Sequence, residues 1–125
     1  MNLKEELKYN KDHSWVLIKG DVATIGAMQE SIDKAGEVVF VNPPREEDEL
    51  RLGDSYTDLE SLKTSISLSS PVSGKVIDVN NKIFDEPSLL NDDSYSNFIC
   101  KVKYDELGEL MSFKKAKKYY EEKLK

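Results

Sequence analysis

Between Trp15 and Val102 the chain consists of short runs of β-favouring residues that are separated by turn-forming residues. This spacing is typical of a small barrel or sandwich, because a helical bundle would show longer segments with a helical period. A length of 125 residues matches one compact domain with a modest core. We therefore predict a single, mainly β domain over residues 1–125, with a β body at about 9–103 and a helical segment at about 105–124.

Turn residues divide the β body into its predicted elements. Gly20 lies between two β-favouring runs and predicts a hairpin, since glycine readily adopts the positive φ of a tight reversal. Gly36 predicts the end of a short helix, and Pro43 with Pro44 stops a strand that we expect to be buried. An aspartate at Val39, inside that strand, should then be severely destabilising. The predicted elements are strands 15–18 and 22–25, helix 27–35, strand 38–41, a solvated charged loop at 45–49, a turn at 50–53, strands 55–60 and 65–69, a turn bracketed by Pro71 and Gly74, strand 75–79 and strand 98–103.

The sequence Ser-Ile-Ser-Leu-Ser at 65–69 alternates polar and apolar residues, as expected of a strand with one buried face. With the β-favouring run before it, this strand predicts a hairpin. Lys63 lies at the tip of that hairpin, framed by the acidic side chains of Asp58 and Glu60. A lysine at an exposed turn is ordinary by itself, but a modifying enzyme can reach it without unfolding the domain.

The apolar period changes near the C-terminus from that of a strand to that of a helix. Phe113, Ala116, Tyr120 and Leu124 fall at i, i+3, i+7 and i+11, which places them on one helix face. We expect this face to dock on the β body, because a helix that binds a membrane surface would normally carry a stronger apolar face.

The charge of the chain is unevenly distributed. Residues 112–125 hold six lysines and two glutamates, a balance of +4, and the whole chain carries −6, so the first 111 residues carry −10. An acidic body disfavours general nucleic-acid binding, because phosphate neutralisation requires a basic surface. No apolar run is long enough to cross a membrane, and the charged start does not resemble a secretion signal. We expect a soluble intracellular monomer that binds neither nucleic acid nor membrane.

Few residues suited to catalysis are present. The single histidine, His13, leaves little from which to build a metal site or a histidine-based triad. The single cysteine, Cys100, excludes an internal disulfide and fits a reducing compartment. Because Cys100 lies in the last predicted strand, we expect it to be a small residue of the core and not a reactive thiol. Phosphate-binding glycine loops, metal-ligand clusters and serine elbows are missing from the sequence, so we expect no catalytic residues and no metal.

Motifs along most of the chain, from about Leu7 to the C-terminal helix, match one known family in order and spacing. The most specific of them is Glu-Ser-x-Lys in the predicted hairpin, followed by Ser-Pro-x-Ser-Gly. They are His13-Ser14-Trp15-Val16, Gly20-Asp21-Val22-Ala23-Thr24-Ile25-Gly26, Gly36-Glu37-Val38-Val39-Phe40-Val41 with Pro44, Glu60-Ser61-Leu62-Lys63, Ser70-Pro71-Val72-Ser73-Gly74-Lys75-Val76, Val79-Asn80, Pro87, Leu90-Asn91 and Tyr95. By these motifs the chain resembles the glycine cleavage system H protein family, lipoyl-carrying relatives of the lipoyl and biotinyl domains.

The resemblance implies a lipoyl-domain-like barrel-sandwich hybrid of two antiparallel sheets, with short helices and a C-terminal helix. It also implies that lipoate is attached to Lys63 and that Glu60 helps the modifying enzyme to recognise its target. Leu62 and Thr64 stand where biotinyl domains have two methionines, which favours lipoate over biotin. The protein would then be a carrier and not an enzyme, because the cofactor and its partner enzymes supply the chemistry.

The resemblance further implies a set of partners. The lipoyl arm on Lys63 would carry aminomethyl and dithiol forms between a pyridoxal-phosphate glycine decarboxylase, an aminomethyltransferase and dihydrolipoamide dehydrogenase. A lipoate ligase or a lipoyl/octanoyl transferase would attach the arm, and the tether would raise the effective concentration of its reactive end. The expected location is the cytoplasm, or the mitochondrial matrix in a eukaryote.

Several departures from the family pattern, Ser14 above all, leave alternatives open. Ser14 stands where the family has a glutamate, and Glu47 stands where it has a glycine. A serine can form a hydrogen bond but cannot neutralise the cationic amine of an aminomethyl group. One alternative is therefore an H-like protein for lipoyl relay, for carriage of sulfur intermediates or for redox-linked regulation. Another is an unmodified interaction module that retains only the fold.

Overall fold

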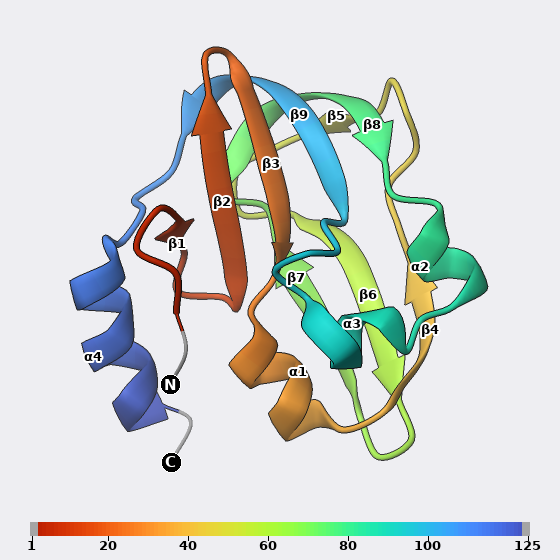
Figure 1. Cartoon of the computed structure of the whole chain (residues 1–125). Coiled ribbons are helices and arrows are strands. Elements are labelled where there is room, and N and C mark those ends of the chain that lie inside the picture. Colours follow the sequence, from red (N-terminus) through yellow and green to blue (C-terminus); the bar gives the residue numbers. More distant parts are fainter. Residues whose placement is uncertain (1–2, 124–125) are drawn as a thin grey trace.

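The structure is a computed structural model that describes residues 3–123, and it consists of two antiparallel sheets with short helices around them (Figure 1). This architecture confirms the predicted mainly β fold with a C-terminal helix. The strands are β1 (Lys8–Tyr9), β2 (Ser14–Lys19), β3 (Val22–Ala27), β4 (Val38–Asn42), β5 (Glu49–Leu50), β6 (Ser55–Ser61), β7 (Ser65–Ser69), β8 (Val72–Val79) and β9 (Cys100–Leu107). The helices are α1 (Gln29–Ala35), α2 (Lys82–Asp85), α3 (Leu89–Asp93) and α4 (Phe113–Lys123).

The main core is built from side chains of both sheets. The larger sheet has the strand order β1-β2-β3-β9-β8-β5, and the smaller has the order β4-β6-β7. Successive side chains of a regular strand point to opposite faces, so the inward-facing residues of the two sheets together exclude water. Leu59 on β6 and Leu68 on β7 are buried in this core, as the alternation predicts. Cys100 on β9 is buried there too, which confirms that it is a core residue.

Helix α4 lies beside β1 (Figure 1). Ala116 and Tyr120 are buried, which confirms the predicted docking face, whereas Leu124 lies outside the described residues. The Tyr120 hydroxyl accepts a hydrogen bond from the His13 N–H at 2.9 Å and donates one to the Asn10 carbonyl at 2.5 Å. These bonds connect α4 to the segment that leads into β2.

Strand β9 continues farther than the sequence predicts. The change of apolar period predicts a helical segment from about residue 105, whereas β9 ends at Leu107 and α4 begins at Phe113. The added part of β9 pairs with β8. Backbone groups can form hydrogen bonds with a neighbouring strand whatever side chains the residues carry. Pairing with β8 therefore extends β9 beyond the point where the period of apolar residues changes.

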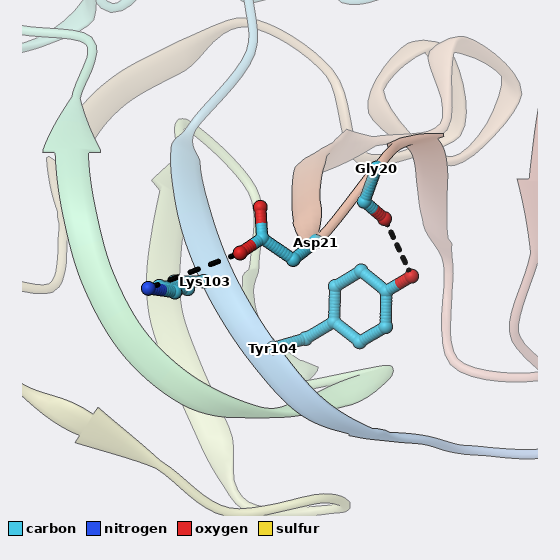
Figure 2. A network of polar contacts seen from close by, with 4 residues as sticks. All are labelled: Gly20, Asp21, Lys103 and Tyr104. Carbon is cyan, nitrogen blue, oxygen red and sulfur yellow. Dashed lines mark hydrogen bonds and ion pairs between the residues drawn. The ribbon is translucent and has the colours of Figure 1, made fainter.

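The turn between β2 and β3 is held against β9 (Figure 2). The Tyr104 hydroxyl donates a hydrogen bond to the Gly20 carbonyl at 2.9 Å, and the Tyr104 N–H donates one to the Asp21 carbonyl at 3.1 Å. Nζ of Lys103 lies 3.8 Å from Oδ2 of Asp21, but both side chains are exposed, so this ion pair contributes little. The predicted hairpin is confirmed, and its turn lies at the opposite end of the molecule from the β6–β7 tip (Figure 1).

Gly74 lies inside β8 and not at a turn bracketed by Pro71, so that prediction is wrong. Its φ is 156°, and the pairing of β8 with β9 is irregular between Ser73 and Gly74. A Cβ at this position would come within 2.2 Å of the Lys103 carbonyl oxygen. The glycine therefore serves the close approach of two strands, a role that sequence alone does not distinguish from that of a turn residue.

Strand β4 is only half buried, which corrects the predicted buried strand. Val38 and Val41 face the core, whereas Val39 and Phe40 are 48% and 50% exposed. The register of β4 on β6 shifts between Val38 and Phe40. Such an irregularity lets two consecutive side chains turn outward. The predicted severe effect of an aspartate at Val39 is therefore wrong, because its charge would reach water.

Residues 45–49 are exposed, as predicted, but Glu49 and Leu50 form strand β5 and not the end of a loop and the start of a turn. Glu47, which replaces the glycine of the family pattern, has a φ of 76°. Residues other than glycine rarely adopt this region, at a cost on the order of 1 kcal/mol. The loop is held in place by the N–H of Glu47, which donates a hydrogen bond to the Val76 carbonyl at 2.8 Å. The loop therefore keeps a glycine-like backbone without the glycine.

Candidate functional site

Lys63 lies at the exposed tip between β6 and β7, where the sequence predicts it. Ser61 closes the tip, because its N–H donates a hydrogen bond to the Thr64 carbonyl at 2.8 Å and its Oγ accepts one from the Thr64 N–H at 3.0 Å. Glu60, the second predicted site residue, is exposed on β6 opposite Ser65. Both predicted residues are therefore exposed, and they lie three positions apart in the chain.

The hairpin tip is anchored to the end of α1, and both lie at the same end of the molecule (Figure 1). Oγ of Ser61 donates a hydrogen bond to the Ala35 carbonyl at 2.7 Å, and the N–H of Leu62 donates one to the Glu37 carbonyl at 3.1 Å. The Ala35 carbonyl is one of the groups that a helix end leaves without a partner, and the serine supplies that partner. A lysine on this tip therefore projects from a fixed base.

Gly36 gives the Lys63 side chain a path toward α1. Its φ of 96° fits the predicted helix terminator. In addition, a Cβ at Gly36 would lie 3.5 Å from Cε of Lys63, so the aliphatic stem of Lys63 passes along this backbone. The glycine thus ends the helix and leaves room for the lysine.

A cleft of about 400 Å³ opens beside the tip, between α1, the hairpin and the end of α4. Its lining combines apolar side chains with two hydroxyl groups and three nitrogen-bearing side chains. The lining residues are His13, Ser31, Lys34, Ala35, Thr64, Ile66 and Lys123. The sequence placed Thr64 and Ile66 in the hairpin and His13 in a motif shared with the family, but it did not bring the lining residues together.

His13 is held in the wall of this cleft by its backbone and its ring. Its φ is 66°, and its Nδ1 lies 2.7 Å from Oγ of Ser31 on α1. Burial lowers the pKa of the imidazole from its usual 6.5, and the positive charges of Lys123 and Lys34 lower the pKa further, against the opposing effect of Asp12. The ring is therefore neutral at pH 7.

We expect the imidazole of His13 to titrate below pH 6.5 in a proton NMR titration. It is the only histidine in the chain, so its ring signals need no assignment. Because the folded pKa is lowered, the unfolded chain binds more protons below about pH 6.5, and the free energy of unfolding should fall as the pH drops through this region. The His13→Gln variant should lose this contribution. A midpoint at or above 6.5 would contradict the burial of the ring.

A sequence model of the family described as "Glycine cleavage H-protein" matches residues 7–125. The chain belongs to the glycine cleavage H-protein family. Members of this family are lipoyl carriers, and they act as carrier subunits without catalysing a reaction themselves.

Individual relatives agree over nearly the whole chain. The glycine cleavage system H protein of Clostridioides difficile (strain 630) is 44% identical over 120 residues, covering 95% of this chain and 96% of the relative. That of Staphylococcus carnosus (strain TM300) is 37% identical over 122 residues, covering 97% of each chain. The crystal structure of a glycine cleavage system H protein from Mycobacterium marinum has a TM-score of 0.87 and 27% identity, covering 97% of this chain and 98% of that one.

Ser14, which replaces the glutamate of the H-protein family motif, does not face the cleft. It is fully buried, and its Oγ lies 2.8 Å from the Tyr56 hydroxyl. Asp12 is also turned away, because its Oδ2 accepts hydrogen bonds from both the N–H and the hydroxyl of Ser69 on β7. No carboxylate is present among the described residues that line the cleft.

The other potential reactive groups do not form a site. Burial raises the pKa of the Cys100 thiol well above its usual range, so the thiol is not a nucleophile at neutral pH. Within residues 3–123, no group of histidine, cysteine, aspartate and glutamate side chains could hold a metal ion. None of the described helices is long and apolar enough to span a membrane. Lys63 and the cleft beside it remain the candidate site.

Proposed function

We propose that this H-protein family member carries lipoate in amide linkage to Nζ of Lys63. The observation that carries the proposal is the exposed lysine on a tip that is hydrogen-bonded to α1 and borders a cleft. Ala35 and Ile66 give the cleft apolar surface that suits a dithiolane ring, so the residues present fit the group. Lipoate supplies redox and group-transfer chemistry when attached, whereas the chain supplies the tether and its base.

The partners proposed for the lipoylated protein are those of glycine decarboxylation. They are the pyridoxal-phosphate glycine decarboxylase, the aminomethyltransferase and dihydrolipoamide dehydrogenase. A lipoate ligase or lipoyl/octanoyl transferase attaches the group, and the exposed carboxylate of Glu60 contributes to its recognition of the tip. We infer a cytoplasmic location, since the two relatives named above are bacterial and the single buried cysteine needs no oxidising compartment. The proposed oligomeric state is a monomer.

Intact mass spectrometry after coexpression with a lipoate ligase tests the attachment. We expect one lipoyl mass increment on the wild-type chain and none on Lys63→Arg. Lys19→Arg, which changes an exposed lysine at the other end of the molecule, should keep the increment. Glu60→Gln should slow the modification without abolishing it. An unmodified wild-type chain would instead favour an interaction module that retains only the fold.

The burial of Ser14 favours a second candidate function. The Ser14 hydroxyl is hydrogen-bonded to the Tyr56 hydroxyl inside the protein, so this position provides no group that could hold a cationic amine in the cleft. An H-like protein that carries lipoyl groups for lipoyl relay, for sulfur intermediates or for redox-linked regulation would not need that group. Glycine/bicarbonate exchange, measured with the lipoylated protein and glycine decarboxylase, separates this candidate from a carrier in glycine decarboxylation.

A further inference from the structure

Three of the six large apolar side chains that are exposed in the described residues lie around the hairpin that carries Lys63. They are Val39 and Phe40 on β4 and Leu62 at the tip, which are 48%, 50% and 73% exposed. Their backbones adjoin, because β4 pairs with β6 and the N–H of Leu62 donates a hydrogen bond to the carbonyl of Glu37, just before β4. A group of exposed apolar side chains on adjoining segments marks an interaction surface. We refer to these three side chains as the tip surface.

Phe40 lies on the outer face of the smaller sheet, beside Glu60. Residues directly opposite each other on neighbouring strands point to the same face, and Phe40 is opposite Glu60. The adjacent pair, Val41 with Leu59, points the other way into the core. The outer face therefore places an exposed aromatic ring next to the carboxylate that lies three positions before Lys63.

The charges that border the tip surface are negative. Glu37 and Glu60 are exposed, and Asp58 lies on the same outer face as Glu60, two positions before it on β6. The two ion pairs found within residues 3–123 involve other carboxylates. A partner with an apolar patch bordered by cationic side chains would complement this arrangement, since interfaces combine an apolar centre with a charged and polar rim.

The tip surface and the cleft lie on different sides of the hairpin. The strands of the smaller sheet follow the order β4-β6-β7, and the hairpin residues that line the cleft are Thr64 and Ile66, at the β7 side. A stable complex buries about 800 Å² on each partner, far more than residues 62–64 can offer. An enzyme that holds Lys63 for reaction therefore needs surface next to the tip, and β4 offers an apolar one.

We propose that the tip surface, Val39, Phe40 and Leu62, is where the enzyme that attaches lipoate to Lys63 docks, through an apolar patch bordered by cationic side chains. This inference rests on the proposed attachment to Lys63 and extends it to the surface that the attaching enzyme contacts. The irregular pairing of β4 with β6 turns two consecutive apolar side chains outward, which gives the enzyme more apolar contact than a regular strand would. Phe40 anchors the contact, because aromatic side chains dominate binding energies at interfaces.

Steady-state lipoylation kinetics test this docking. A lipoate ligase activates lipoate with ATP as the acyl adenylate, and Nζ of Lys63 then displaces AMP and loses a proton as the amide bond forms. Intact mass spectrometry follows the product. In the Val39→Thr, Phe40→Thr double variant, KM for the unmodified chain should rise about tenfold with kcat nearly unchanged, because the lost contacts hold the chain equally before and during the reaction.

Folding of this double variant should be normal, because both side chains are exposed and threonine is well suited to strands. Its urea midpoint checks this. Leu62→Thr leaves β4 unchanged and should raise KM about threefold by the same loss of apolar contact. Added salt should raise the wild-type KM, and this dependence should be weaker in Glu60→Gln, since one of the charges that meets the enzyme is gone.

The matched control is the Ile77→Thr, Leu107→Thr double variant, which removes two exposed apolar side chains from β8 and β9 of the larger sheet. It should keep the wild-type KM. A wild-type KM in the β4 double variant would overturn this inference and leave the proposed function intact. The inference would also be wrong if that variant were lipoylated normally and showed a raised KM only in exchange with glycine decarboxylase, which would assign the tip surface to that enzyme. A wild-type chain that gains no lipoyl mass would overturn the proposed function itself.

Discussion

Val41→Asp should severely destabilise the fold, with a loss of about 4 kcal/mol or more in the free energy of unfolding. Val41 is 2% exposed and pairs with Leu59, which is 1% exposed. An aspartate there would bury a carboxylate in an apolar core with no cation to pair with it. A single domain is stabilised by only about 5–15 kcal/mol, so this loss removes a large part of the total. Urea denaturation followed by circular dichroism measures it.

The matched control is Val39→Asp on the same strand. Val39 is 48% exposed, so its substitution should cost no more than about 1 kcal/mol, mainly through the weaker strand preference of aspartate. The two variants introduce the same charge two positions apart and differ in burial. Equal denaturation midpoints for the two variants would contradict the exposure of the Val39 side chain on β4.

Lys63→Arg should reduce glycine/bicarbonate exchange to the level of a reconstituted mixture that lacks the carrier. Arginine keeps the positive charge and most of the length of the side chain, but its guanidinium remains protonated and does not form the amide with lipoate. Lys63 is exposed and lies outside the core, so the free energy of unfolding should change by no more than about 0.5 kcal/mol. Loss of function should therefore occur without loss of structure.

The same assay distinguishes the two candidate functions. Lipoylated wild-type protein should support exchange with glycine decarboxylase, and lipoylated Lys19→Arg should match it. Exchange by Lys63→Arg would exclude Lys63 as the attachment site. Absence of exchange by a fully lipoylated wild-type chain would instead favour the H-like carrier of other lipoyl traffic, for which the burial of Ser14 is the structural argument.

The hairpin that presents Lys63 could be predicted because its signals are local. Alternation of serine with Ile66 and Leu68 indicates which face of β7 is buried. The short connection between this run and the β-favouring run before it indicates a hairpin turn. The sequence could not reveal that Val39 is exposed. That outcome depends on an irregular pairing between β4 and β6, which are separated by more than ten residues. The sequence also could not show whether Gly74 belongs to a turn or allows the close approach of β8 and β9.

The sequence by itself determined the class of fold, the lysine at the hairpin tip and, through shared motifs, the family. These features rest on short-range periodicity, on turn chemistry and on the order of motifs along the chain. Only the tertiary structure decided what surrounds that lysine. His13, the end of α1, the hairpin and Lys123 meet in one cleft, and Ser14 turns away from it toward Tyr56. The physical reason is that packing brings together residues far apart in the sequence, and their shared electrostatic field exists only once the chain has folded.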